Sequence, residues 1–290
     1  MPRIALQAVG RPRVVGVVNV TPDSFSDGGL HASPAAAIEF ARRLVREGAD
    51  VLDVGGESTR PGARPVDAEE ERRRVVPVVE GLRRLGLATP ISVDTRKADV
   101  AEAALRAGAT LVNDVTAATG DPRMLATVAR LGAGIVLMHM RGEPATMQDA
   151  PRYDDVTAEV LAFLEARAAA AIEAGVAAAR VFVDPGIGFG KTFAHNETLF
   201  RDLERFTARN RVWVGASRKG FLGAITGRPP AERLAASLAC AARASAAGAH
   251  AVRVHDVEAT VDLLAVLARI SPGSRPRTAG SAVPRRADAE

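Results

Sequence analysis

Polar residues that could bind a substrate occur where short apolar segments of this sequence end. The clearest case is the run 181–184, which closes on Asp184 before a loop rich in proline and glycine. A charged carboxylate beside an apolar core is costly unless it is paired, so Asp184 is expected to meet a ligand or another side chain. It could also only cap the turn that follows. The loop 186–191, Gly-Ile-Gly-Phe-Gly-Lys, lacks the spacing of nucleotide-binding loops, which argues against a nucleotide site.

The pattern of an apolar run followed by a polar residue recurs along the chain. These polar residues are Asn19, Asp53, Asp94, Asn113, His139, Asp184, Ser217 to Lys219, Arg253 and His255. Asp94, Asn113 and Asp184 offer oxygens that can accept hydrogen bonds from the N–H groups of a flat heterocycle. Asp53 fits less clearly, because it could serve only its own Gly-Gly turn.

The remaining strand-end residues are mostly cationic. Lys219, Arg253 and His255 follow the last two apolar runs and could together hold a phosphate group. Arg253 and His255 are two residues apart and face the same way in an extended strand, and Asp256 could cap the next helix. The alternatives are a surface ion pair for Arg253 and a capping or core role for His255. No histidine has metal-site spacing, His139 is interpreted as structural, and Gly-Ala-Ser at 215–217 is not a nucleophile elbow.

Alternating apolar and amphipathic segments indicate the elements that position these residues. Strands are expected at 13–19, 51–54, 91–94, 110–114, 135–138, 181–184, 212–215 and 251–254. Helices are expected at 33–47, 67–85, 97–107, 122–131, 156–174, 197–208, 230–247 and 257–269. About eight strand–helix units predict an α/β fold, a single (β/α)₈ TIM barrel, with a doubly wound open sheet as the alternative. In a barrel, the polar strand ends meet at one mouth.

One barrel domain is expected over residues 1–270, followed by a disordered tail at 271–290 that has little apolar content. The first two βα loops, 19–29 and 55–62, are long and rich in Gly, Pro, Ser and Asp. Loops of this kind at the mouth often act as lids, although they could be plain surface insertions. Phe25 could make an apolar contact on closure, and Arg60 could meet a charged substrate group.

The composition limits the classes of function. The 290 residues have a formal net charge of +4, and the arginines are scattered among acids along the helical segments. This pattern is typical of solvated helix faces, so no nucleic-acid partner is expected. Cys240 is the only cysteine, which suits a reducing compartment. No segment resembles a membrane span or a cleavable leader, so a soluble, cytoplasmic protein is expected.

Taken together, the motifs resemble those of the dihydropteroate synthase family, over nearly the whole chain except the tail. They are 19–29, 53–62, Ser-Val-Asp-Thr-Arg at 92–96, Asn-Asp at 113–114, 184–191, Ser-Arg-Lys at 217–219 and Arg-Val-His-Asp at 253–256. The resemblance implies a barrel enzyme that joins 6-hydroxymethyl-7,8-dihydropterin diphosphate to 4-aminobenzoate and releases diphosphate. It also implies magnesium (Mg²⁺) as the cofactor and a homodimer.

The resemblance implies a role for each matching residue. The residues similar to the family's pterin-binding set are Asp94, Asn113, Asp184 and Lys219. Those similar to its diphosphate and metal set are Asn19, Thr59, Arg60, Arg253 and His255, with Asn19 as the metal ligand. Those similar to the aminobenzoate side, where sulfonamide drugs compete, are Ser217, Phe25, Pro61 and Phe189.

The mechanism that the resemblance implies begins with C–O cleavage to a pterin cation, which the arylamine then attacks. Asp94 and Asp184 would stabilise the cation, while Arg253, His255 and Mg²⁺ would stabilise the leaving diphosphate. No general base is assigned, because an aromatic amine is already unprotonated at neutral pH. A pterin-dependent methyltransferase and a catalytically silent pterin-binding paralogue remain as alternatives.

Overall fold

The computed structural model describes residues 11–21, 33–58, 65–144 and 146–270. Its strands, in chain order, are β1 (Arg13–Asn19), β2 (Val51–Gly55), β3 (Ile91–Asp94), β4 (Leu111–Asp114), β5 (Gly134–Met138), β6 (Val181–Asp184), β7 (Trp213–Val214) and β8 (Ala251–Val254). The helices are α1 (Pro34–Arg46), α2 (Ala68–Arg84), α3 (Ala98–Arg106), α4 (Met124–Arg130), α5 (Val156–Glu173), α6 (Phe193–Arg201), α7 (Leu203–Thr207), α8 (Gly220–Thr226), α9 (Leu234–Ala246) and α10 (Val257–Ile270). Two 3₁₀ turns, Ala178–Arg180 and Pro230–Glu232, precede β6 and α9.

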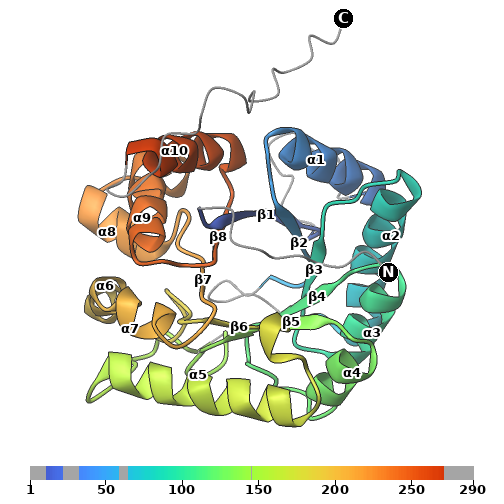
Figure 1. Cartoon of the computed structure of the whole chain (residues 1–290), viewed down its shortest axis with the longest axis horizontal. Coiled ribbons are helices and arrows are strands. Elements are labelled where there is room, and N and C mark those ends of the chain that lie inside the picture. The colour runs from blue at the N-terminus through green and yellow to red at the C-terminus, as the bar shows by residue number, and fades with distance from the viewer. Residues whose placement is uncertain (1–10, 22–32, 59–64, 145, 271–290) are drawn as a thin grey trace, which may run out of the picture.

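The strands form one parallel sheet in the order β6-β5-β4-β3-β2-β1-β8-β7. The two outer strands of this order also meet, because Val183 of β6 bridges to Val212 just before β7. The sheet therefore closes into a (β/α)₈ barrel, as predicted, and not into an open doubly wound sheet. Figure 1 shows the strands in the centre with the helices around them, and the red β8 beside the blue β1.

Strand register decides which side chains face the inside of the barrel. Asp53 is level with Ser92 on the next strand, and Asp94 is level with Asn113. Because successive side chains in a strand point to opposite faces, every second residue of each strand faces inward. This places Asn19, Asp53, Asp94, Asn113, Asp184 and Arg253 on one inner surface, whereas His139, one residue beyond β5, has the opposite orientation.

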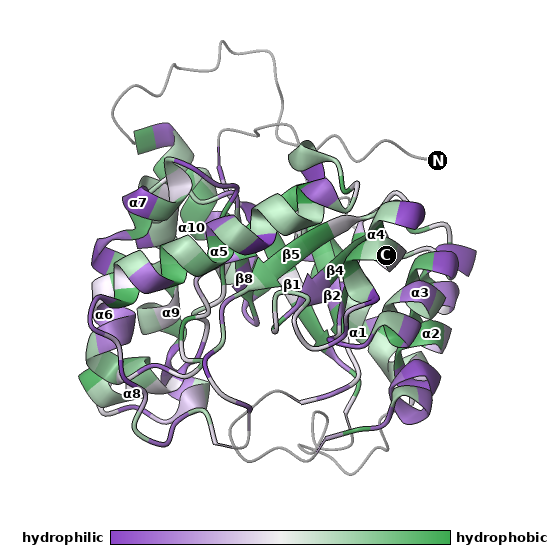
Figure 2. Cartoon of the chain, turned by 90° about the horizontal axis from the view of Figure 1, so that it is seen from below, coloured by the Kyte–Doolittle hydropathy of each residue, from purple (hydrophilic) through white to green (hydrophobic). Residues whose placement is uncertain are grey.

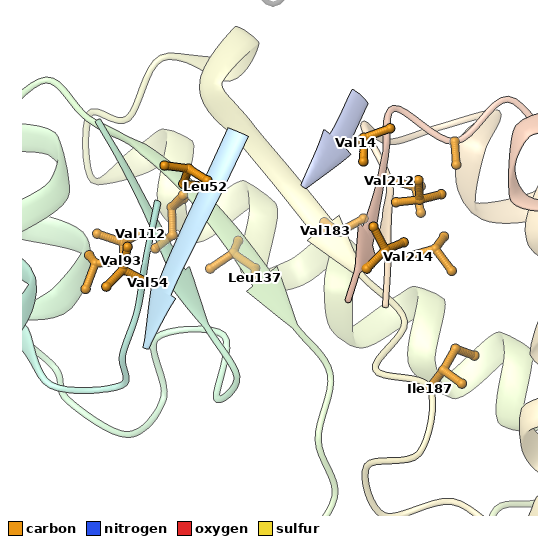
Figure 3. Packing of buried hydrophobic residues seen from close by; sticks show 14 of the residues in the cluster. Val14, Leu52, Val54, Val93, Val112, Leu137, Val183, Ile187, Val212 and Val214 are labelled. Atoms are coloured by element: carbon orange, nitrogen blue, oxygen red, sulfur yellow. The ribbon is translucent and has the colours of Figure 1, made fainter. Parts of the chain in front are cut away.

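The residues between these inward positions build the main hydrophobic core, between the strands and the helices. Its members include Val14, Leu52, Val54, Val93, Val112, Leu137, Val183 and Val214, which Figure 3 labels. The helices cover this layer with apolar faces and turn charged residues outward, as the purple outer rims of α2 and α3 show (Figure 2). Fully burying one such aliphatic side chain contributes roughly 1.5–3 kcal/mol.

Three helical regions differ from the sequence-based prediction. The helix expected at 197–208 begins earlier, after a capping box at Thr192, and is divided at Asp202, which accepts a hydrogen bond from Thr157. The helix expected from 230 begins as a 3₁₀ turn before α9. Helix α8 was not predicted, because its seven residues are too few to show helical periodicity, and it ends at Gly227 with φ +69°.

No described helix has both the length and the apolar content needed to cross a membrane. The predicted tail at 271–290 and the tips of the two long βα loops lie outside the described residues.

Candidate active site

Arg253 is the centre of the polar cluster at the carboxyl ends of the strands. Its Nε donates to Oδ2 of Asp53 at 2.6 Å, and Nη2 donates to Oδ2 of Asp94 at 2.8 Å. Asp53 belongs to β2 and Asp94 to β3, and only β1 separates β2 from β8, which carries Arg253. The sequence suggested that acceptors and cations occupy separate parts of the mouth, but Arg253 lies among the acids. Burial lowers the pKa of Arg253, and Asp53 and Asp94 outweigh it, so that the net shift is upward.

Both burial and charged neighbours shift the pKa of Asp94. Removal from water raises the pKa of its carboxyl group to about 7, although Arg253 acts in the opposite direction, and the charge of Asp53 adds to the rise. A carboxylate that titrates near neutrality is uncommon and is typical of functional sites.

Asp53 does not serve only its own turn, which was one interpretation of the sequence. It is 0% exposed, and its Oδ2 accepts from both Nδ2 of Asn113, at 3.1 Å, and Nε of Arg253. Its Oδ1 has no hydrogen-bond partner within the described part of the chain, and the same holds for Oγ of the neighbouring Ser92. Asp53 is therefore a buried anchor beneath Asn113 and Arg253.

Asp184 and Lys219 form the opposite side of the mouth. Oδ1 of Asp184 accepts from the backbone N–H of Gly186 at 2.7 Å, so the predicted turn-capping interaction exists. Burial raises the pKa of Asp184, and Lys219 opposes that rise. Burial also lowers the pKa of Lys219 to about 8. A Cβ at Gly215 would lie 3.8 Å from both Asp184 Oδ2 and Arg253 Cβ, so this glycine leaves the space between acid and cation open.

Lys219 contacts the glycine loop 186–191 through a backbone carbonyl and an aromatic ring. Lys219 Nζ donates to the carbonyl oxygen of Ile187 and lies 4.6 Å from the ring centroid of Phe189. This contact places Phe189, assigned by resemblance to the aminobenzoate side, next to a pterin-side residue.

Ser217 and His255 are also brought together. Oγ of Ser217 accepts from the backbone N–H of His255 at 3.2 Å and lies 3.1 Å from its Nδ1. Asp256, considered as a helix cap, stands just before α10, and its carboxylate pairs with the guanidinium of Arg218. Asn19 ends β1 on the inward face, and Thr59, Arg60, Phe25 and Pro61 lie outside the described residues.

Lys191 was not singled out as a site residue. Its side chain is fully buried behind the glycine loop, and Nζ donates to the carbonyl oxygens of Phe189 and His139, at 3.0 and 3.3 Å. Nζ is also 2.9 Å from Nδ1 of His139, and burial together with the lysine charge lowers the pKa of this histidine to about 3. His139 thus supports the loop from behind, in agreement with a structural role. A Cβ at Gly186 (φ +67°) would be 1.8 Å from the His139 oxygen, so only glycine fits this contact.

A second charged cluster, also missed, lies beneath the long loop after β2. Lys97 at the start of α3 pairs with Glu57 and with Glu71 of α2, and Arg96 pairs with Glu57 at 3.3 Å. Burial raises the pKa of Glu71. The cluster fixes the described base of that loop. One sequence signal was available, because Lys97 and Lys191 are two of only three lysines in an arginine-rich chain.

The mouth thus combines inward carboxylates, an amide and two half-buried cations at the face where (β/α)₈ enzymes bind their substrates. The family model of pterin binding enzymes matches residues 15–255, and the chain belongs to this family.

Similar proteins in this family include dihydropteroate synthases. The enzyme of Escherichia coli (strain K12) is 45% identical over 260 residues, which are 89% of this chain and 92% of that protein. A Yersinia pestis dihydropteroate synthase solved with a sulfonamide drug complex has a TM-score of 0.85 and 42% identity, over 90% of this chain and 94% of its own. A Xanthomonas albilineans dihydropteroate synthase solved with 4-aminobenzoic acid has a TM-score of 0.83 and 52% identity, over 88% and 92%.

Proposed function

We infer that this protein joins 6-hydroxymethyl-7,8-dihydropterin diphosphate to 4-aminobenzoate, giving 7,8-dihydropteroate and diphosphate, the dihydropteroate synthase step of folate biosynthesis. Its similarity to dihydropteroate synthases over most of both chains supports this reaction. The observation that carries it is the acceptor set of Asp94, Asn113 and Asp184 around one opening, with Arg253 and Lys219 beside it.

The acceptor set is suited to the pterin. A pterin presents a row of ring and amino N–H groups, and the two carboxylates and the Asn113 amide can accept hydrogen bonds from them. Lys219, next to Asp184, can donate to a ring acceptor. We propose these four residues as the pterin site.

We propose Arg253, His255, Asn19, Thr59 and Arg60 for the diphosphate. Arg253 is a fixed guanidinium, and a guanidinium binds phosphate oxygens with two parallel hydrogen bonds.

We propose Ser217 and Phe189 for the aminobenzoate. Ser217 is in contact with His255, and Phe189 is in contact with Lys219. The two proposed substrate positions are therefore adjacent, as a condensation requires.

The reaction we propose is a substitution at the pterin methylene carbon. The C–O bond breaks with its electron pair passing to diphosphate, and the nitrogen of the neutral arylamine then bonds to the carbon and loses its proton to water. Asp94 and Asp184 stabilise the positive charge that spreads over the pterin, and Arg253 and His255 stabilise the departing anion. This chain therefore needs to supply electrostatic stabilisation and no strong base.

The residues present fit a magnesium ion only if the substrate's phosphates supply most of its other ligands. The described residues contain no group of three or more His, Cys, Asp or Glu side chains arranged to hold a metal. Asn19 offers a single neutral oxygen, and Mg²⁺ in phosphate sites commonly keeps several waters and binds substrate phosphates. We propose Asn19 as the protein ligand of a magnesium ion that binds with the diphosphate and neutralises part of its charge.

We further propose a cytoplasmic homodimer with small molecules as its only substrates. The free thiol of Cys240 supports a reducing compartment. Sedimentation equilibrium over a hundredfold concentration range tests the assembly, and a single monomeric mass throughout would remove the dimer from the proposal.

The deciding experiment incubates the purified full chain with the pterin diphosphate and 4-aminobenzoate, with and without Mg²⁺, and measures dihydropteroate. We expect product that depends on both substrates and on Mg²⁺. Pterin binding without condensation would indicate the silent paralogue. Methyl transfer from a methylated pterin would indicate the methyltransferase instead.

A further inference from the structure

One buried carboxylate supports two groups of the mouth at once. The same oxygen of Asp53, Oδ2, accepts from Asn113 Nδ2 at 3.1 Å and from Arg253 Nε at 2.6 Å. Asp53 is 0% exposed, so it does not itself touch a substrate. We propose that Asp53 is a positioning residue for the pterin, which sets the orientation of the Asn113 amide and retains Arg253 when the pterin occupies Asp94. This inference rests on the proposed function.

The orientation of Asn113 follows from the chemistry of its partner. An ionised carboxylate only accepts hydrogen bonds, so the Asn113 amide must turn its NH₂ group toward Asp53. Its oxygen is then on the other side of the amide, and no described residue donates to that oxygen. Asn113 is level with Asp94 on the adjacent strand. The amide therefore offers an acceptor beside the carboxylate of Asp94, which is what the N–H row of a pterin needs.

Arg253 is held by two carboxylates that differ in their exposure to a ligand. Asp94 is at the mouth, whereas Asp53 lies one strand away and is fully enclosed. When pterin N–H groups bind Asp94, they compete with Arg253 for its oxygens. The 2.6 Å bond to Asp53 is out of the ligand's reach and keeps the guanidinium in the barrel. One anchor thus serves both the pterin acceptors and the cation proposed for the diphosphate.

Asp114 provides a matched control. It is also 0% exposed and directly follows Asn113, but it faces the outer layer of the barrel. Its Oδ1 accepts from the N–H and the hydroxyl of Thr116, both at 2.7 Å, and Oδ2 accepts from the N–H of Ala118. Its side chain forms no hydrogen bond with a residue proposed for the pterin, although its charge adds to the upward shift in the pKa of Asp94. Asp114→Asn therefore removes an equally buried charge without changing the hydrogen bonds of the mouth.

The Asp53→Asn variant tests the orientation argument. The new amide can place its oxygen where Oδ2 lies and accept from both partners, or it can turn its NH₂ group to Asn113. The orientation of Asn113 is then no longer fixed by a carboxylate, and the ion pair with Arg253 is lost. In calorimetry with 6-hydroxymethylpterin, we expect about tenfold weaker binding than wild type, from the difference between bonds to charged and to neutral groups. Asp114→Asn should bind within about threefold of wild type, even if its melting temperature falls.

The swapped pair Asp53→Asn/Asn113→Asp is the rescue. A carboxylate at position 113 accepts from the new amide and presents its second oxygen to the mouth, so we expect about threefold recovery of pterin affinity over Asp53→Asn. If Asp53→Asn does not fold, Asp53→Glu keeps the buried charge but misplaces both hydrogen bonds, and it should still weaken binding about tenfold.

Two results would overturn the role of Asp53. One is pterin affinity of Asp53→Asn, or of Asp53→Glu where that variant is used, equal to that of Asp114→Asn. The other is a swapped pair no better than Asp53→Asn. Failure of the proposed function looks different, because wild-type protein would then neither bind the pterin nor form dihydropteroate.

Discussion

The inward positions of the barrel form two layers of opposite character on the same strands. The lower layer is apolar and consists of Val15, Val51, Leu111, Val136, Phe182, Trp213 and Ala251. The upper layer, two residues further along several of these strands, holds Asp53, Asn113, Asp184 and Arg253. The step from one layer to the other is a single pleat repeat of two residues. The same backbone geometry therefore places an apolar layer below and a layer of polar and charged side chains above.

The two layers make opposite contributions to the stability of the fold. Burying the lower layer stabilises the fold, whereas taking the charges of the upper layer out of water opposes it, even when they are paired. Substitutions in the lower layer should therefore reduce stability and leave catalysis intact. Substitutions in the upper layer should reduce binding and catalysis. Variants in each layer test whether this division holds.

The largest effect is expected for Arg253→Ala. Loss of a fixed cation beside a developing anion typically costs about 10²–10³-fold in rate, so kcat/KM for condensation should fall by about 10³-fold. Binding of a phosphate-free pterin should fall by only about tenfold. Steady-state kinetics and calorimetry on the same preparation give both numbers, and equal losses would refute the assignment of Arg253 to the diphosphate.

Trp213→Ala tests the lower layer. Trp213 is buried and its ring is 5.9 Å from that of Phe182, so truncation leaves a large cavity. The free energy of unfolding should drop by about 3 kcal/mol, measured by urea denaturation. KM for both substrates should stay within about twofold of wild type, and a large rise in KM would show that the layers are not independent.

Asp184→Asn should weaken the binding of a phosphate-free pterin by about 10–30-fold, because a carboxylate bond becomes a neutral one. The amide oxygen can still accept from Gly186, so thermal unfolding should change little. Undiminished affinity in calorimetry would remove Asp184 from the pocket.

The smallest effect is a pH dependence that belongs to the upper layer. Burial raises the pKa of Asp94 to about 7, and only its charged form is a full acceptor, so pterin affinity should increase severalfold from pH 6 to pH 8. Asp94→Asn should abolish this increase, and an unchanged pH profile in that variant would assign it to another group.

The same pKa makes a prediction about stability. The folded protein retains the Asp94 proton between the ordinary value of 3.8 and about 7, while the unfolded chain has released it. This contribution to the free energy of unfolding therefore falls as pH rises through that window. Asp94→Asn should lack it in urea denaturation at pH 5 and pH 7, and an equal difference in both proteins would exclude Asp94.

The sequence predicted most of the fold because local patterns specify it. Eight apolar runs separated by amphipathic segments indicated the barrel, and the polar residue at the end of each run indicated the mouth. The seven-residue helix α8 and the break at Asp202 were missed, since one is too short for periodicity and the other depends on a distant hydroxyl of Thr157.

The partners within the site could not be predicted in the same way. Arg253 and Asp53 are 200 residues apart in the chain, and their ion pair exists only because β8, β1 and β2 are adjacent in the closed sheet. Likewise, the sequence shows Lys191 only as the last residue of a glycine loop, and its position behind that loop depends on β5. The sequence identified the residue types at the strand ends. Which cation pairs with which acid depends on the strand register across the barrel.

A crystal structure of the protein with 6-hydroxymethylpterin would locate the ligand outright. We predict the pterin ring in the upper layer, with its N–H groups on Asp94, Asn113 and Asp184 and with Arg253 still bonded to Asp53. A pterin bound away from Asp94 and Asp184 would contradict the account.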